Sequence, residues 1–278
     1  MPQVARLQPA AEEVEDSRRA VQSVEVGGRL LVALAESPGA LPLKELAARA
    51  GLVPSRAHPY LVSFQRLGLV EQEPGSGYYA LGATALQIGL ACLHQLDPLK
   101  FAEPVAQALA RSTGHAVAIA VWGNFGPTIV RLFEARQPLH VVLRVGSVMS
   151  VLGTATGRAF AAAVPPEQLE RAITLAPGQE VGAAAAGAKN WRKELEEAAA
   201  EVRRHGVARA VGRPIPGVNA FSAAAFDHEG HCALVLTAMD HEDRLQGDWN
   251  SAGAQALREA VAAITRRLGG AAAGQPPG

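Results

Sequence analysis

Glycine and proline divide residues 18–82 into three short helical patterns followed by two short strand patterns. The helical patterns stop at residues that end helices or turn the chain, namely Ser37-Pro38-Gly39, Gly51 and Gly68. Two strand patterns, 69–73 and 78–81, then flank a turn rich in glycine and proline. Few folds place three short helices and a hairpin in this order. The pattern predicts a winged helix-turn-helix.

Apolar residues at helical spacing give each of the three helices one buried face. The first helix, expected over 18–37, carries Val21, Val24, Val26, Leu30, Leu31 and Leu34 on or near one side. The second spans Leu43–Ala50. For the third we expect Ser55 as the N-cap, because serine is favoured there. Its stripe of Ala57, Leu61, Phe64 and Leu67 should face the other two helices.

The opposite face of the third helix carries polar and basic residues. No acidic residue occurs between Leu46 and Val70, whereas Arg49, Arg56 and Arg66 do occur there, so the local field is positive. A solvated helix face is the plain alternative, but the order of the elements favours a helix that enters the DNA major groove. The expected DNA-binding residues are Ser55, Arg56, His58, Tyr60, Ser63 and Arg66.

The composition limits the remaining classes of protein. The 278 residues carry 26 Lys and Arg against 26 Asp and Glu, so any site for a polyanion must be local. Cys92 and Cys232 lie far apart in apolar contexts, which favours buried thiols in a reducing compartment. The sequence shows no signal peptide and no apolar run of about 18 residues, so we expect a cytoplasmic protein without a membrane partner.

Residues 83–97 form a predicted linker helix with leucines on one side. Leu86, Leu90, Leu93 and Leu96 continue beyond the hairpin, where a single domain would not bury them. We therefore expect the helix to pack on a second protomer. Residues 1–17 and 269–278 lack periodicity and read as flexible tails.

Residues 98–268 show a mixed pattern of helices and strands. Helices are expected at 98–112, 154–164, 166–175, 191–205 and 251–268. Strands are expected at 115–121, 128–134, 139–145, 218–226 and 232–238. The fold class is therefore α+β, with an antiparallel sheet flanked by helices in the C-terminal domain.

The chain resembles the IclR family of bacterial transcriptional regulators. The resemblance is carried by three segments, LPLKELAARAGLVPSRAHPYLVSFQRLGLVEQEPGSGYYALG, LRVGSVMSVLGTATGRAFAA and EVRRHGVARAVGRPIPGVNAFSAAAFDHEGHCALVLTA, and it covers residues 20–268. It implies a GAF-like effector-binding domain and dimers that often pair into tetramers. Pro59 stands where the family usually has arginine, and in a helix capped by Ser55 it would crowd the Ser55 carbonyl. We therefore expect the helix to begin nearer His58.

Strand alternation places small side chains on one face of the expected sheet. Val218, Ala220 and Ser222 share a face, as do Ala233, Val235 and Thr237 on the next strand. The family resemblance matches Ala220, Val235, Thr237 and Met149 to effector-contacting positions. The loop before the helix at 154 offers backbone N–H groups and threonine hydroxyls to a carboxylate. The expected effector-binding residues are Met149, Ala155, Thr156, Val218, Ala220, Ser222, Val235 and Thr237.

The walls of this predicted pocket are mostly apolar, which favours a small organic acid with an aromatic or branched body. Ordinary strand core is the plain alternative, and Arg213 is either a partner for the acid or a surface residue. No catalytic or cofactor motif is present, so we expect no enzyme and no cofactor. His228-Glu229-Gly230-His231 reads as a strand turn, not as a metal site. We therefore predict a regulator that binds double-stranded operator DNA as a homodimer or homotetramer. The main alternative is a small-molecule sensor whose winged helix binds a protein.

Overall fold

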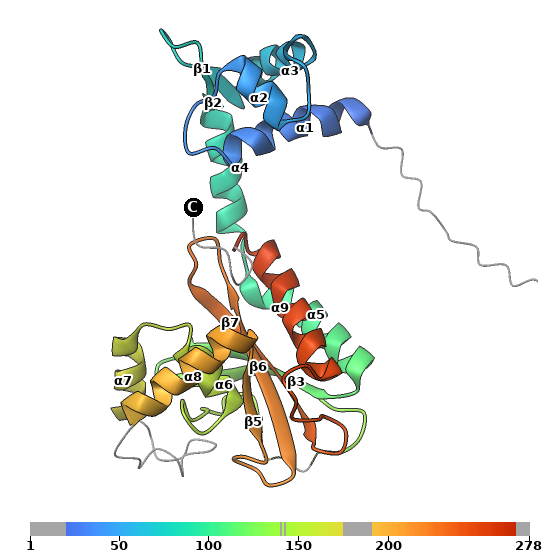
Figure 1. Ribbon diagram of the computed structural model, residues 1–278, viewed down its shortest axis with the longest axis vertical. Coiled ribbons are helices and arrows are strands. Elements are labelled where there is room, and N and C mark those ends of the chain that lie inside the picture. Colours follow the sequence, from blue (N-terminus) through green and yellow to red (C-terminus); the bar gives the residue numbers. More distant parts are fainter. Residues whose placement is uncertain (1–20, 140, 142, 175–190, 271–278) are drawn as a thin grey trace, which may run out of the picture. The chain divides into compact units, whose positions relative to one another are not determined.

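The computed structural model describes residues 21–139, 141, 143–174 and 191–270. Within these the chain divides into two compact units, one ending at Gln95 and the other beginning at Leu96 (Figure 1). In the described part of the chain, no helix is both long and apolar enough to cross a membrane. The two units are described separately.

The N-terminal unit contains the predicted helices and hairpin in the predicted order. Its elements are α1 (Gln22–Ala35), α2 (Leu43–Arg49), α3 (Pro54–Arg66), β1 (Val70–Gln72), β2 (Tyr79–Leu81) and α4 (Ala83–His94). The core consists of fully buried residues from the first three helices, with Leu30, Leu46, Ala57 and Leu61 at its centre. The strands of the antiparallel hairpin close this core with Val70 and Tyr79. This unit is a winged helix-turn-helix.

The start of α3 differs from the prediction. The helix begins at Pro54 with Val53 as its N-cap, so Ser55 is not the cap and the helix does not begin near His58. Proline suits the first helical position because its fixed φ fits the helix and its missing N–H would have had no partner there. Pro59 lies inside the helix. It costs one hydrogen bond, from its own position to the Ser55 carbonyl, and the helix continues through it.

Three apolar residues that the sequence places on buried faces lie at the surface instead. Val21 and Val24 are exposed at the start of α1, and Leu67 is exposed just after α3. The buried face of each helix is therefore narrower at its end than the periodic pattern suggests. Cys92, expected to be buried, is exposed on α4, whereas Cys232 is half-buried.

The C-terminal unit is a five-stranded antiparallel sheet between two layers of helices (Figure 1). The strand order is β4 (Gly126–Phe133), β3 (Ala116–Gly123), β7 (Cys232–His241), β6 (Val218–Phe226) and β5 (Ala208–Val211). Helices α5 (Pro98–Thr113) and α9 (Ala252–Arg267) cover one face. The helices of the other side are α6 (Ala155–Ala161), α7 (Pro166–Thr174) and α8 (Trp191–His205), with α6 directly on the sheet.

The predicted alternation along β6 is confirmed. Phe221, Ala223 and Ala225 belong to the core under α5 and α9, whereas Ala220 and Ala224 pack toward α6. On β7 the prediction for Ala233 is wrong, because Ala233 packs with the α5–α9 core and Val235 with the α6 core. The pairing of β6 with β7 skips Ala233, and such a bulge places an extra side chain on one face.

Three further differences concern the edges of this unit. The strand expected at 139–145 is wrong, since Leu139, Val141 and residues 143–145 are outside any strand, while His140 and Val142 lie outside the described residues. The strand β5 was not predicted. The C-terminal tail does not begin at Gly269, because Gly269 forms a β-bridge with Asp227 and Gly270 donates its N–H to the Thr265 carbonyl. The expected tails at 1–17 and from 271 onward lie outside the described residues.

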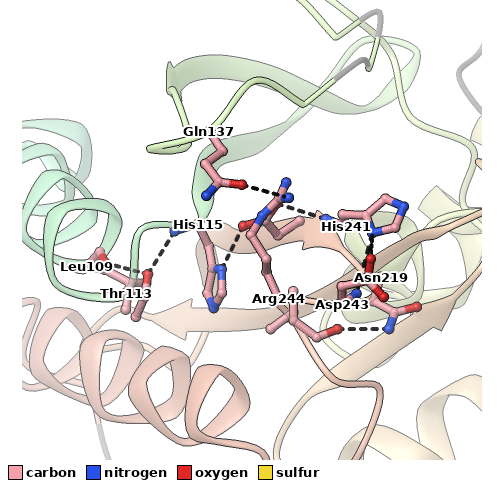
Figure 2. Close-up of polar contacts among 10 residues, drawn as sticks. Leu109, Thr113, His115, Gln137, Asn219, His241, Asp243 and Arg244 are labelled. Atoms are coloured by element: carbon pink, nitrogen blue, oxygen red, sulfur yellow. Dashed lines mark hydrogen bonds and ion pairs between the residues drawn. The ribbon is translucent and has the colours of Figure 1, made fainter.

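A buried ionic network joins the ends of β3 and β7 to the segments that follow β4 and β7. Figure 2 shows the side chains of His115 and Arg244 converging there. Asp240 is 1% exposed, and its carboxylate lies 3.0 Å from His115 Nδ1 and accepts hydrogen bonds from Arg244 Nε at 2.9 Å and the His241 N–H at 2.8 Å. Arg244 Nη1 also donates to Gln137 Oε1 at 3.1 Å. The network therefore links the start of β3 to the end of β7, two neighbouring interior strands of the sheet.

Candidate functional site

The outward face of α3 carries most of the residues predicted to contact DNA. Ser55, Arg56, His58, Ser63 and Arg66 are exposed, on the side away from the buried Ala57 and Leu61. Tyr60 is the exception. It is half-buried and packs with the core, and a Cβ on Gly27 of α1 would lie 3.1 Å from its ring. Tyr60 therefore belongs to the α1–α3 contact rather than to the exposed face.

The charge of this unit is uneven. Among the described residues, Arg56 and Arg66 form no ion pair, whereas Arg49 is held by Glu45 at 2.7 Å. The hairpin has the opposite sign, because Glu71 and Glu73 are its only charged residues. Of these two elements, α3 and not the wing carries the positive charge that a polyanion requires.

A small cavity lies in the C-terminal unit between β6, β7 and the start of α6. Its volume is about 40 Å³, compared with roughly 300–1,000 Å³ for typical small-molecule sites. Six of the eight residues predicted to contact an effector line it: Met149, Ala155, Thr156, Val218, Ala220 and Thr237. The structure thus brings together residues from three separate segments of the chain.

The polar end of this cavity is a chain of three buried hydroxyls. Thr156 Oγ1 lies 2.8 Å from Thr237 Oγ1, which lies 2.7 Å from Ser222 Oγ. Ser222 is fully buried and reaches the cavity only through Thr237. Each hydroxyl has one proton, so the two hydrogen bonds leave one O–H free to donate, and the direction of the bonds decides whether it belongs to Thr156, Thr237 or Ser222.

The N-terminus of α6 offers a carboxylate fewer free hydrogen-bonding groups than the sequence suggests. Thr154 caps the helix by accepting the Gly157 N–H at 3.0 Å, and its own hydroxyl donates to the Ser150 carbonyl at 2.9 Å. The Thr154 hydroxyl is therefore committed to holding the loop. The Thr156 and Thr237 hydroxyls remain the polar groups at the cavity.

Two predicted effector contacts, Ser222 and Val235, do not line the cavity, and several lining residues were missed. Val235 is fully buried in the core beneath α6 and does not line the cavity. The missed lining residues are Val141, Leu143, Thr154, Ala210, Pro214, Ile215 and Met239. Arg213 is exposed and lies at the cavity edge. Strand alternation from Thr237 would have found Met239, two residues further along the same face.

Close packing around the cavity loop requires a glycine. A Cβ on Gly157 would lie 2.1 Å from the Ser150 carbonyl oxygen and 2.5 Å from Val151 Cα, both backbone atoms that cannot rotate away. We expect Gly157→Ala to lower the free energy of unfolding by about 1–3 kcal/mol, the usual cost of overpacking. Urea unfolding measures this. Gly28→Ala within α1, where a Cβ meets nothing within 4 Å, is the control and should not destabilise.

The turn between β6 and β7 gathers the Asp227, Glu229 and His231 side chains. Their ligand atoms lie within 4.8 Å of one another. Asp227 Oδ1 accepts the N–H groups of Glu229 and His231, both at 2.9 Å, as expected for a polar turn residue. Glu229 and His231 are also paired with each other at 3.2 Å. The turn itself accounts for this arrangement.

Two family models match the chain, one for each unit. The model described as the IclR helix-turn-helix domain matches residues 23–74. The model described as the C-terminal part of the bacterial transcriptional regulator IclR matches residues 90–266. The first match lies within the N-terminal unit, and the second covers most of the C-terminal unit together with the end of α4.

Individual relatives match over nearly their whole length. The glycerol operon regulatory protein of Streptomyces griseus is 31% identical, over 90% of this chain and 98% of the relative. The crystal structure of Pseudomonas aeruginosa HmgR superposes with a TM-score of 0.80 at 34% identity, over 90% of this chain and 99% of that one. The Agrobacterium tumefaciens repressor BlcR, 22% identical with a TM-score of 0.75 over 90% of this chain and 98% of its own, shares the fold.

Proposed function

The chain belongs to the IclR family of bacterial transcriptional regulators, and we propose that it binds a pseudo-palindromic operator as a dimer or tetramer under the control of a small organic acid. As a regulator of this family it is a DNA-binding protein with an effector domain, not an enzyme. The proposal rests on two features of one chain. The C-terminal unit has a cavity with threonine hydroxyls at one end, and α3 has an exposed basic face. We place the protein in the cytoplasm, where its DNA would lie.

On the DNA side, we propose that α3 enters the major groove with its exposed face. Ser55, Arg56, His58, Ser63 and Arg66 would make the contacts, with Arg56 and Arg66 supplying the charge. Ser63 already donates its hydroxyl proton to the Pro59 carbonyl at 3.0 Å, so it would act toward DNA as an acceptor. Because Pro59 lies on this face, the operator sequence should differ from those of relatives that have arginine at that position.

Helix α4 supports the dimer. It has no buried residue within its own unit, and Leu86, Leu90 and Leu93 are 64%, 45% and 38% exposed on one side. Three leucines at this spacing form an apolar stripe of the kind that packs against a second helix. The partner we propose is α4 of a second copy. A two-fold dimer of this kind would present two α3 helices to half-sites about 34–36 Å apart or a multiple of that.

We expect Leu90→Lys to weaken the dimer roughly thousandfold. A buried interface leucine is worth about 2 kcal/mol, and two-fold symmetry doubles the effect. Sedimentation equilibrium measures the dissociation constant. Ile88→Lys changes an apolar residue that is 59% exposed on the opposite side of α4, and it is the matched control. Equal weakening by both substitutions would argue against the leucine stripe as the interface.

On the ligand side, we propose that the cavity expands when it is filled, because its volume of about 40 Å³ is too small for an organic acid. Its walls are mainly apolar, with Met149, Val218 and Met239 around the Thr156 and Thr237 hydroxyls. Long unbranched methionine side chains rearrange readily. We propose an acid with an aromatic or branched body whose carboxylate accepts a hydrogen bond from Thr156 or Thr237. Arg213, at the edge of the cavity, belongs to the same lining.

We expect Thr156→Val to weaken binding of such an acid about tenfold, because it removes one hydrogen bond to a charged group. The probes are benzoate, phenylacetate and 3-methylbutanoate, tested by calorimetry. Thr174→Val removes a comparable hydroxyl hydrogen bond, to Glu170 on the exposed face of α7, and serves as the control. Unchanged affinity in the Thr156 variant would place the acid elsewhere.

The DNA side of the proposal is tested by titration against the DNA immediately upstream of the protein's own gene and its divergent neighbour. Measurements at two salt concentrations, with unrelated duplex as competitor, should give a discrete protected site and a steep loss of affinity with salt. Binding that is equal on unrelated DNA, or absent, would overturn the proposal. A sensor whose winged helix binds a protein would then be the better account.

A further inference from the structure

A second cavity lies beside the first, between α6, α8 and β5. Its volume is about 490 Å³, which is within the usual range for a small-molecule site. Five charged side chains line it. They are Arg158 from α6, Glu194 and Glu201 from α8, Arg209 from β5, and Arg213 from the loop that follows.

Three of these charges are already engaged. Arg158 Nη2 donates to Glu201 at 2.7 Å, and Arg209 Nη1 donates to the Gly247 carbonyl at 2.6 Å. The Arg209 guanidinium also stacks 4.0 Å over the Trp249 ring. These contacts hold the cavity walls, because they tie α6 to α8 and β5 to the segment after β7.

Two opposite charges remain. Among the described residues, Glu194 and Arg213 form no ion pair, and Arg158 Nε is buried without a hydrogen-bond partner. Glu194 and Glu201 are seven residues apart on α8, so both point from one face of the helix, and the acidic wall faces the basic side chains of β5 and its loop. The free groups are thus one carboxylate, one guanidinium and one buried N–H donor.

We propose that this cavity binds a free α-amino acid. The ammonium of the ligand would pair with Glu194, and its carboxylate would accept hydrogen bonds from Arg213 and Arg158 Nε. A dianion would be repelled by Glu194, and a simple amine would leave Arg213 and Arg158 Nε unsatisfied. Leu152, Ala210, Val211 and Pro214 provide apolar wall for an aliphatic side chain.

The ligand set for the test is L-leucine with two matched analogues. In 2-hydroxy-4-methylpentanoate a hydroxyl replaces the ammonium, and in 3-methylbutylamine the carboxylate is missing. Calorimetric titration of the full-length protein should give binding of leucine at millimolar or lower concentration and at least tenfold weaker binding of the amine, since each analogue loses one charged contact.

The variant Glu194→Gln separates this site from the effector cavity, which Glu194 does not line. We expect it to weaken leucine binding roughly tenfold. The analogue 2-hydroxy-4-methylpentanoate can also enter the effector cavity. Its binding there should be the same in Glu194→Gln as in the wild type. Glu196→Gln makes the same charge change at an exposed position of α8 outside the cavity and should have no effect. Circular dichroism confirms that both variants are folded.

Two results would overturn the inference. One is the absence of leucine binding at millimolar concentration in the wild-type protein. The other is leucine binding that Glu194→Gln leaves unchanged, which would locate the ligand elsewhere. No DNA is present in these titrations, so their failure is distinguishable from failure of the proposed operator binding.

Discussion

Replacing Asp240 by alanine should lower the free energy of unfolding by about 3 kcal/mol. The substitution leaves His115 Nδ1, the His241 N–H and the Arg244 guanidinium without the acceptor that they share (Figure 2). Removing one partner of a buried pair costs about 3–5 kcal/mol. We expect the lower end of this energy range because the Arg244 side chain is 32% exposed and can be rehydrated. Urea unfolding near neutral pH measures the change.

The control is Asp243→Ala, which removes a carboxylate three residues away that is 81% exposed and is paired with His241. Its effect should stay below about 1 kcal/mol, as for other exposed pairs. Equal destabilisation by the two substitutions would contradict a structural role for the buried network.

The contribution of Asp240 should also depend on pH. Burial alone would raise the pKa of Asp240, but the hydrogen bonds from Arg244, His115 and the His241 N–H together lower it below its ordinary value. A lowered folded-state pKa gives stability that is present above the unfolded-state pKa of about 4 and is lost as pH falls through the folded-state pKa. The stability difference between wild type and Asp240→Asn should therefore be constant near neutrality and shrink below about pH 4.

The double substitution of Arg56 and Arg66 by alanine should nearly abolish operator binding. Each arginine contact to a base or phosphate is worth about 1–3 kcal/mol, so losing both from one α3 costs about 2–6 kcal/mol. If both contacts are to phosphates, the slope of log affinity against log salt concentration should become shallower by about 2 for each α3 bound. Fluorescence anisotropy with operator duplex at several salt concentrations measures both quantities.

The matched control is the substitution of Arg49, an arginine of α2 that is held by Glu45 at 2.7 Å. Arg49→Ala should change operator affinity by less than about threefold, the range of an exposed ion pair. Operator affinity and salt slope that both stay the same in the double variant would mean that α3 does not carry the DNA contacts.

Much of the fold follows from sequence periodicity. The structure confirms α8 and β6 at both predicted ends, because their patterns are long and are bounded by clear breaks. The short strand β5 was missed, since four residues between Gly206 and Gly212 carry too little pattern to separate a strand from a loop. The segment 139–145 alternates like a strand, but its Val141 and Leu143 line the cavity instead of joining the sheet.

Residue preferences also gave a wrong helix start where two of them competed. Ser55 is a residue type favoured at N-caps, yet Pro54 at the first helical position determines the start of α3. Cavity residues on predicted strands, such as Ala220 and Thr237, could be found from alternation. Ile215 could not, because it reaches the cavity from a loop whose path only the tertiary structure defines.

The most direct test of the account is operator affinity with and without an acid that occupies the cavity. The acid is whichever of benzoate, phenylacetate and 3-methylbutanoate binds most tightly, and the comparison is between wild type and Thr156→Val. We expect the acid to shift the operator affinity of the wild type, and the same concentration to shift the affinity of the variant much less, because coupling requires binding in the cavity. Operator affinity that no bound acid changes, or an equal shift in the variant, would contradict it.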